Sequence, residues 1–183
     1  METKIKKILT SRPVLISGAD GFMGSHLTEE LLKYKADVYV FIRATSSGSL
    51  HNINHLQKKI KILRGDLTDK NAVLQALKVL KMAFKKKRLK PIIFHLGAQA
   101  HVGESWQRPY ETLHTNVLGT VNLLQSIIDL KLELFKLDVA GSSEEYGNIK
   151  KEMIKSYRFD HQGGLILDEC SPLNPQSGYA ASK

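Results

Sequence analysis

The chain has 183 residues, 42% of them hydrophobic, and a formal net charge of +9. This composition is typical of a globular protein with one core, and no segment approaches the roughly 18 consecutive apolar residues of a membrane span. Cys170 is the only cysteine, which excludes a disulfide framework and a cysteine-ligated zinc site, and the polar N-terminus does not resemble a secretory signal. We therefore expect a cytoplasmic protein that has no membrane partner.

The positive charge is concentrated in three lysine-rich segments, at residues 4–7, 81–90 and 150–155. These segments lack interleaved aromatic residues and any recognisable nucleic-acid-binding motif. We interpret them as solvated surface and expect no nucleic-acid partner, although a basic binder of nucleic acid stays open as an alternative that rests on net charge alone. A basic field would also favour a substrate that carries a diphosphate.

Short apolar segments alternate with segments of helical periodicity along most of the chain. Strands are expected at residues 14–17, 37–42, 60–63, 92–96 and 134–140, and helices at 25–33, 71–81 and 112–130. This alternation predicts an α/β fold, a doubly wound parallel sheet of the Rossmann type. We expect residues 1–183 to form one dinucleotide-binding domain, in which residues 148–168 are a surface insertion or a loop with a small hairpin.

A glycine-rich segment follows the first expected strand and opens the first helix. Its glycines each have a physical role, because Gly18 allows a tight turn, Gly21 lets the backbone approach a pyrophosphate, and Gly24 permits close packing of helix on strand. The helix N-terminus offers free N–H groups and a positive dipole end to phosphates. The predicted phosphate-binding residues are Gly18, Asp20, Gly21, Phe22, Met23 and Gly24. The alternative is a glycine-rich turn without a ligand.

A Tyr-x-x-x-Lys pair stands at Tyr179 and Lys183, after a segment that contains Pro172 and Pro175. On a helix, side chains four residues apart share a face, so the lysine charge can lower the pKa of the tyrosine. The phenolate could then act as a base near neutral pH.

Several motifs in the same order resemble the extended short-chain dehydrogenase/reductase family. They are the Gly-x-x-Gly-x-x-Gly loop, Gly65-Asp66-Leu67, His95-Leu96-Gly97-Ala98-Gln99, Asn116-Val117-Leu118-Gly119-Thr120, the segment 141–147 and the Tyr-x-x-x-Lys pair. The resemblance spans residues 13–183, and 148–168 is its main departure. It implies that Asp66 and Leu67 contact the adenine and that Leu96 and Ala98 line the cofactor site.

The end of the second expected strand indicates which nicotinamide cofactor is preferred. Relatives that use NAD place a carboxylate there for the ribose 2′-hydroxyl, whereas this chain has Arg43 followed by hydroxyl residues that include Ser46. A guanidinium and hydroxyls suit a 2′-phosphate, and the segment resembles the arginine–serine turn of NADP-using GDP-mannose dehydratases. We predict NADP, with NAD as the alternative; an arginine merely exposed in a serine-rich loop is the competing interpretation.

The resemblance also implies catalytic roles. Tyr179 would remove the proton of a sugar 4-hydroxyl, Lys183 would hold the nicotinamide ribose, and Ser142 would hydrogen-bond the 4-hydroxyl. Ser143 and Glu144 occupy the positions of the acid and base that remove water across C5 and C6 in the dehydratases. The implied function is a GDP-mannose 4,6-dehydratase-like enzyme whose substrate is a nucleotide-sugar, with a GDP-sugar as the expected one.

Several alternatives stay open at this stage. The segment 141–147 also resembles nucleotide-sugar 4-reductases, a 4-epimerase of the same family fits the motifs, and Glu144 could simply cap a turn. A non-catalytic dinucleotide-binding fragment is the alternative from another class, against which the Ser142, Tyr179 and Lys183 set argues.

Complete relatives continue beyond the catalytic lysine into a sugar-binding domain and pair through two long helices. We therefore expect a fragment that lacks the substrate domain, has little activity alone and forms a homodimer when complete. His95, His101 and His114 are not spaced as a metal set, so we interpret them as packing or turn residues and expect no metal.

Overall fold

The computed structural model describes residues 2–43 and 50–183, which form two compact units. The first, here called the sheet unit, comprises Met1–Ala98 and Leu118–Ala140. The second, here called the hairpin unit, comprises Gln99–Val117 and Gly141–Lys183.

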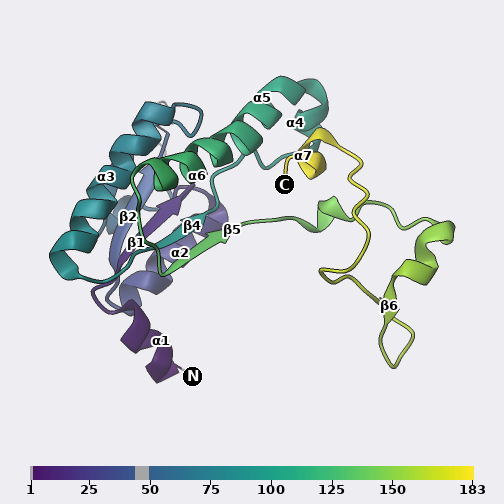
Figure 1. Ribbon diagram of the computed structural model, residues 1–183, viewed down its shortest axis with the longest axis horizontal. Coiled ribbons are helices and arrows are strands. Elements are labelled where there is room, and N and C mark those ends of the chain that lie inside the picture. The colour runs from purple at the N-terminus through teal and green to yellow at the C-terminus, as the bar shows by residue number, and fades with distance from the viewer. Residues whose placement is uncertain (1, 44–49) are drawn as a thin grey trace. The chain divides into compact units, whose positions relative to one another are not determined.

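The sheet unit is built on five parallel strands in the order β3-β2-β1-β4-β5 (Figure 1). The strands are β1 (Pro13–Ser17), β2 (Asp37–Ile42), β3 (Lys61–Arg64), β4 (Ile92–His95) and β5 (Lys136–Val139). The central strand β1 pairs with β2 on one side and β4 on the other, so that Val14 lies opposite both Val38 and Ile92. The strand order reverses direction at β1, as in doubly wound sheets, and the predicted fold class is confirmed.

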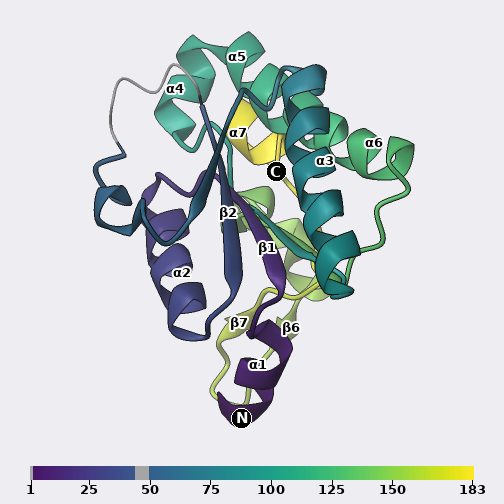
Figure 2. The ribbon, with the colours of Figure 1, turned by 90° about the vertical axis from the view of Figure 1, so that its left-hand side faces the viewer.

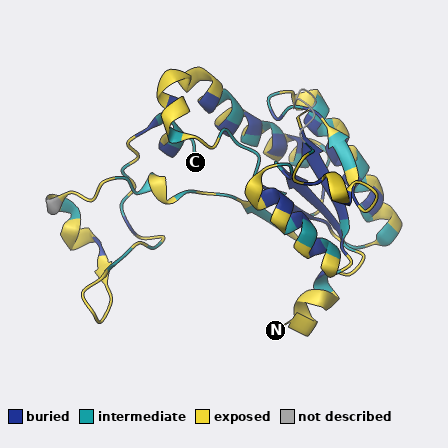
Figure 3. Ribbon diagram, turned by 180° about the vertical axis from the view of Figure 1, so that it is seen from behind, coloured by how far each residue is buried: buried dark blue, intermediate teal, exposed yellow. Residues whose placement is uncertain are grey.

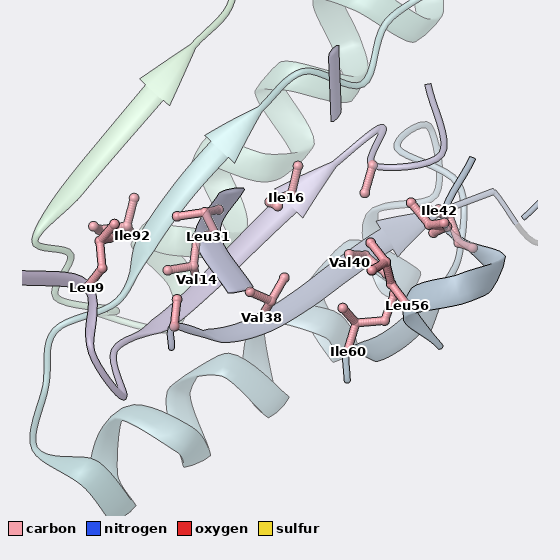
Figure 4. Close-up of a cluster of buried hydrophobic side chains, with 13 residues drawn as sticks. Leu9, Val14, Ile16, Leu31, Val38, Val40, Ile42, Leu56, Ile60 and Ile92 are labelled. Atoms are coloured by element: carbon pink, nitrogen blue, oxygen red, sulfur yellow. The ribbon is translucent and has the colours of Figure 1, made fainter. Parts of the chain in front are cut away.

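Helices cover both faces of this sheet (Figure 2). Helix α2 (Phe22–Lys33) lies on one face, and α3 (Lys70–Lys87) and α6 (Gly119–Asp129) lie on the other. Because side chains alternate across a strand, Val14 and Ile16 join one core cluster (Figure 4), whereas Leu15 joins the second. Burial on both faces explains why β1 and β2 are almost continuously apolar.

Capping residues set the helix ends, which differ from the ends expected from the sequence. Helix α3 is capped at its N-terminus by Asp69, whose carboxylate accepts the N–H groups of Asn71 and Ala72 at 2.8 and 3.2 Å. It continues to Lys87 instead of residue 81 and ends where Arg88 adopts a left-handed φ of 56°. An additional helix, α1 (Glu2–Leu9), was not expected; its last residue is buried in the core.

The helix expected at residues 112–130 is divided. It consists of α5 (Pro109–Leu113), η2 (His114–Leu118), which is a π-helical turn, and α6. Single π-helical turns inside helices often occur at functional sites. This one contains Asn116, which is buried.

The hairpin unit consists mainly of short elements and connecting segments. Its elements besides α5 and η2 are α4 (Val102–Gln107), η3 (Ser143–Glu145), η4 (Lys151–Ser156), β6 (Arg158–Phe159), β7 (Leu165–Ile166) and α7 (Gly178–Ala181). The antiparallel pair β6–β7 is the small hairpin expected within residues 148–168. Exposed residues dominate this segment, whereas the strands β1 and β2 of the sheet are almost entirely buried (Figure 3).

The sheet unit also contains one short 3₁₀ turn, η1 (Asn54–Leu56), before β3. No helix within residues 2–43 and 50–183 has the length and apolar character needed to cross a bilayer.

Candidate functional site

The phosphate loop is a sharp turn at the carboxyl end of β1. Gly18 has a φ of +69°, and a Cβ at this position would lie 2.8 Å from the Cα of Gly97. A Cβ at Gly24 would lie 2.2 Å from the carbonyl oxygen of Gly18, so α2 can approach the turn only with glycine there. Both glycines therefore have the roles that the sequence predicted, in a turn and in close packing.

The first turn of α2 has the features of an anion-binding helix N-terminus. Its N-cap is Gly21, which has no side chain to accept the first helical N–H groups. Among residues 2–43 and 50–183, a Cβ at Gly21 would meet only the carbonyl of Gly18, at 3.3 Å, so these residues leave the space beside Gly21 open. The side chains of Phe22 and Met23 are exposed, and the carbonyl of Asp20 accepts the Nδ2–H of Asn52 at 2.8 Å. This loop fits a pyrophosphate.

The remaining predicted cofactor residues follow β2, β3 and β4, whose carboxyl ends lie along the same edge of the sheet as that of β1. Arg43 is exposed immediately after β2, while Ser46 lies outside the described residues. After β3, one carboxylate oxygen of Asp66 accepts the backbone N–H of Thr68 at 2.9 Å and its hydroxyl at 2.7 Å.

Leu67 has its side chain in the core, so a ligand could meet only its backbone. A Cβ at Gly97 or at Gly119 would lie 2.9 Å from the Leu67 side chain. Leu96 and Ala98, after β4, are half-buried. The sheet unit thus brings the predicted cofactor residues that it contains to one edge of the sheet, whereas Tyr179 and Lys183, also predicted to bind the cofactor, lie in the hairpin unit.

His95 lies at the end of β4, buried in a hydrogen-bonded bridge. Its Nδ1 is 2.8 Å from the hydroxyl of Ser17, and its Nε2 is 3.0 Å from the hydroxyl of Thr120. The Ser17 hydroxyl also accepts the N–H of Gly97 at 3.0 Å. These contacts support the interpretation of His95 as a packing residue. In the described part of the chain, no three histidine, cysteine or carboxylate side chains are grouped to hold a metal.

The predicted substrate residues Ser142, Ser143 and Glu144 lie in the η3 turn of the hairpin unit. The Ser142 hydroxyl accepts the N–H of Glu144 at 3.2 Å, and the carboxylate of Glu145 accepts the N–H of Ser142 at 2.6 Å. This reciprocal arrangement is a capping box. The capping carboxylate is that of Glu145, and the side chain of Glu144 is exposed.

Tyr179 and Lys183 are carried by α7 and the residue that follows its C-cap. The hydroxyl of Ser177 caps this short helix by accepting the N–H of Ala180 at 3.0 Å. Burial lowers the pKa of Lys183, and the negative charge of Glu145 acts in the opposite direction. Helix α7 packs against η3, α4 and α5, so the segments that carry the five predicted catalytic residues are neighbours within the hairpin unit.

Asn116 holds this arrangement in place, a role that the sequence did not predict. Its Oδ1 accepts the N–H of Gln99 at 2.7 Å, and its Nδ2 donates to the carbonyl of Gln99 at 3.1 Å and to the hydroxyl of Ser182 at 2.8 Å. Ser182 in turn donates to the carbonyl of Tyr179 at 2.7 Å. The Asn116 motif was visible in the sequence, but its partners were not. Glu145 was also missed, although Ser142-x-x-Glu145 has the spacing of a capping box.

Comparison with known proteins agrees with this geometry. A sequence profile described as GDP-mannose 4,6 dehydratase matches residues 15–183. The chain belongs to this family. The predicted membership of the extended short-chain dehydrogenase/reductases, which include nucleotide-sugar epimerases and dehydratases, is therefore confirmed.

Curated relatives from the family are similar over almost the whole chain. A GDP-mannose 4,6-dehydratase of Vibrio cholerae is 30% identical over 183 residues, which cover 96% of this chain and 43% of the relative. A dTDP-glucose 4,6-dehydratase of Mycobacterium tuberculosis is 26% identical over 93% of this chain and 45% of its own length. The chain therefore spans less than half the length of these relatives.

Solved structures of family members share the fold. The UDP-glucose 4-epimerase of Thermus thermophilus, in complex with NAD, has a TM-score of 0.69 and 32% identity, over 93% of this chain and 47% of that chain. The dTDP-glucose 4,6-dehydratase DesIV of Streptomyces venezuelae, with NAD and TYD bound, has a TM-score of 0.70 and 27% identity, over 93% of this chain and 48% of that chain.

Proposed function

We propose that this chain is the dinucleotide-binding and catalytic part of an NADP-dependent nucleotide-sugar 4,6-dehydratase that acts on a GDP-sugar. The observation that carries the proposal is the packing of the η3 turn against α7 within one unit. This packing groups Ser142, Ser143 and Glu144 with Tyr179 and Lys183, the residue types needed to oxidise a sugar alcohol and then eliminate water. In this proposal residues 1–183 are the NAD(P)-binding domain, and the relatives' remaining length corresponds to the sugar-binding domain.

The residues divide the chemistry between two stages. In the first, the phenolate of Tyr179 takes the proton of the sugar 4-hydroxyl, while Lys183 stabilises that phenolate and Ser142 donates a hydrogen bond to the 4-oxygen. In the second, Glu144 takes the C5 proton, which the new 4-ketone has acidified, and Ser143 passes a proton to the departing C6 hydroxyl. A bound nicotinamide would supply the redox chemistry by accepting hydride from C4 and returning it to C6.

The cofactor part of the proposal rests on the phosphate loop and on Arg43. Gly21 and the open amides of α2 suit the pyrophosphate, and the exposed guanidinium of Arg43 suits a 2′-phosphate. Titration calorimetry with NADPH and NADH tests it. Arg43→Asp should weaken NADPH binding by about 10- to 100-fold, the strength of a charge-assisted hydrogen bond, and leave NADH binding unchanged.

The control for this titration is Lys58→Asp, which makes the same charge reversal on an exposed residue. Lys58 precedes the amino end of β3, whereas Arg43 follows the carboxyl end of β2. It should leave the affinity for NADPH within about twofold of the unchanged chain, as expected for a distant exposed charge. Equal losses of NADPH affinity in both variants, or none in Arg43→Asp, would overturn the assignment of Arg43 and leave NAD as the cofactor.

The reaction is tested in a chimaera in which residues 1–183 are followed by the remaining residues of the Vibrio cholerae relative, incubated with GDP-mannose. A 4-keto-6-deoxy product without net consumption of cofactor supports the dehydratase. Net consumption of cofactor indicates a 4-reductase, and a C4 epimer indicates a 4-epimerase, the activity named for the Thermus thermophilus relative. Glu144→Gln should block loss of water, whereas Tyr179→Phe should block both stages. We expect the 183-residue chain alone to turn over GDP-mannose far more slowly than the chimaera.

Exposed apolar side chains on α6 support a homodimer of the complete protein. Val121, Leu124 and Ile128 lie on one face of this helix at helical spacing, and each is exposed. Sedimentation velocity of the chimaera should give a dimer that Leu124→Lys dissociates. The single cysteine, Cys170, is an exposed free thiol, which suits the proposed cytoplasmic location.

A further inference from the structure

Glu145 is the charged residue most closely built into the η3 turn, although the proposed chemistry does not use it. Its carboxylate accepts the N–H of Ser142 at 2.6 Å, and its own carbonyl accepts the N–H of Asn174 at 3.0 Å. A Cβ at Gly141 would lie 2.9 Å from the same carboxylate oxygen, so glycine before Ser142 leaves room for the Glu145 side chain in its observed position. The Glu145 side chain therefore fixes the backbone that presents Ser142.

Helix α7, which Lys183 closely follows, packs against η3, which contains Glu145, so the charge of this carboxylate lies near Lys183. Burial lowers the pKa of Lys183, and the charge of Glu145 raises it, which partly offsets the cost of burying the ammonium. Other charged residues lie on the elements that pack against α7. They are Glu144 on η3, Glu104 on α4, Arg108 between α4 and α5, and Glu111 on α5. Glu145 differs from these residues because its carboxylate accepts the N–H of Ser142 and its charge is the one that raises the pKa of Lys183.

We propose that Glu145 is a positioning residue that joins the two parts of the proposed active site: its carboxylate holds the peptide group of Ser142, and its charge attracts the ammonium of Lys183. The assignment of catalytic roles to Ser142 and Lys183 rests on the proposed function, but the hydrogen bond from Ser142 to Glu145 does not. An apolar side chain at this position could neither accept that hydrogen bond nor supply the negative charge.

Two substitutions separate the hydrogen bond to Ser142 from the effect of the charge on Lys183. Glu145→Gln keeps an oxygen that can accept the N–H of Ser142, since glutamine also serves in capping boxes, but it removes the charge. Glu145→Ala removes both. The matched control is Glu169→Gln, which makes the same chemical change on an exposed residue of the hairpin unit.

The experiment is an NMR titration of the 183-residue chain without cofactor or sugar. In the unchanged chain, the Ser142 amide proton should shift with pH as the Glu145 carboxylate titrates. In Glu145→Gln this response should vanish, and the pKa of Lys183, followed through its side-chain carbon, should fall relative to Glu169→Gln. In Glu145→Ala the pKa of Lys183 should fall similarly, and the Ser142 amide should exchange with solvent about tenfold faster, as expected for loss of a hydrogen bond to a charged group. The α-carboxylate of Lys183 is common to every variant and does not affect the comparison.

Two results would overturn the proposal: a Ser142 amide that does not respond to pH in the unchanged chain, or a Lys183 pKa that is the same in Glu145→Gln and Glu169→Gln. Should Glu145→Ala fail to fold, the glutamine variant alone decides, because it retains the acceptor. None of these measurements requires turnover, so failure of the dehydratase proposal leaves them unaffected. Conversely, a Glu145→Gln chimaera that turns over GDP-mannose at a normal maximal rate but with a shifted pH profile would support both the positioning role of Glu145 and the proposed function.

Discussion

Each of the two units of the chain is stabilised internally by a different kind of contact. In the sheet unit, apolar side chains from β1, β2 and β4 are almost fully buried and form clusters on both faces of the sheet. In the hairpin unit, the buried apolar residues among those described are Tyr157 and Ala180. Its other buried residues are polar and are Ser105, Thr112, Asn116, Ser171 and Ser177. The hydrophobic effect therefore dominates in the sheet unit, and side-chain hydrogen bonds to backbone are more important in the hairpin unit.

The two units also differ in the sign of their charge. The sheet unit carries most of the lysines and arginines, whereas the hairpin unit has more carboxylates than cations. The predicted phosphate loop thus lies in the basic, apolar-cored unit, and the predicted catalytic residues lie in the unit with less buried apolar surface. Regions of this second kind open at lower free energy, and elements that must adjust to a ligand are drawn from them.

Amide hydrogen exchange should reveal the largest difference between the units. The amides of Leu15 and Ile16 in β1 are buried in the centre of the sheet, whereas those of Phe159 and Leu165 are in the exposed β6–β7 hairpin. If the sheet unit opens only by global unfolding, protection in β1 should exceed that in the hairpin by about 1,000-fold or more. Comparable protection in both places would show that the two units unfold as one.

The next largest effect is expected for Gly24→Ala in the sheet unit. The added Cβ would lie 2.2 Å from the carbonyl oxygen of Gly18, a backbone atom that cannot move without displacing α2. We expect the free energy of unfolding to fall by about 3 kcal/mol, measured by urea denaturation. The control is Gly103→Ala in α4, where a Cβ would meet no atom within 4 Å. That change should be neutral or stabilise by up to about 1 kcal/mol, and equal losses in both variants would refute the packing argument.

A smaller, pH-dependent effect is expected at Asp37 in β2. Burial opposes ionisation of this carboxylate, but hydrogen bonds from Lys61 and Lys87 outweigh it and lower the pKa of Asp37. The stabilisation is therefore present above the pKa that Asp37 has in the unfolded chain, and it is lost as the pH falls through the lower folded-state pKa. Because both lysines are partly solvated, Asp37→Asn should lower the free energy of unfolding at pH 7 by only about 1 kcal/mol.

Urea denaturation at pH 7 and in acid tests the effect of Asp37. The difference between Asp37→Asn and the unchanged chain should shrink in acid. Asp129→Asn, which removes an exposed ion pair with Lys70 in the same unit, is the control and should be close to neutral. A loss in Asp37→Asn that persists in acid would mean that packing, and not charge, stabilises this position.

The smallest effect is expected for Ser182→Ala and should be confined to the hairpin unit. The substitution removes the hydroxyl that accepts from Asn116 and donates to the carbonyl of Tyr179. Amides of α7 should exchange faster by about threefold, within the range for the net contribution of one hydrogen bond, while amides of β1 should not change. Ser156→Ala, on an exposed residue of η4, is the control. Faster exchange in β1 would indicate that the two units are coupled more tightly than their separate cores suggest.

Much of the sheet unit could be predicted because its signals are local. The five expected strands lie within a few residues of those observed. The signal is clearest in β1 and β2, because strands buried on both faces are almost continuously apolar. The glycine spacing likewise predicted the turn at Gly18 and the close packing at Gly24. Less was predicted where periodicity was weak or the pattern was long, so α1 and α4 were missed and α5, η2 and α6 were merged into one helix.

The amino-acid sequence by itself determined the alternation of strands and helices, the glycine turn and the presence of the Tyr179–Lys183 pair, because each depends on residues within a few positions of one another. Only the tertiary structure decided that Asn116 bonds to Ser182, that His95 bonds to Ser17 and that α7 packs against the η3 turn. Those partners are far apart in the chain and meet only after the strands and turns have packed. Their hydrogen bonds and charges act over a few ångströms of space and leave no periodic trace in the sequence.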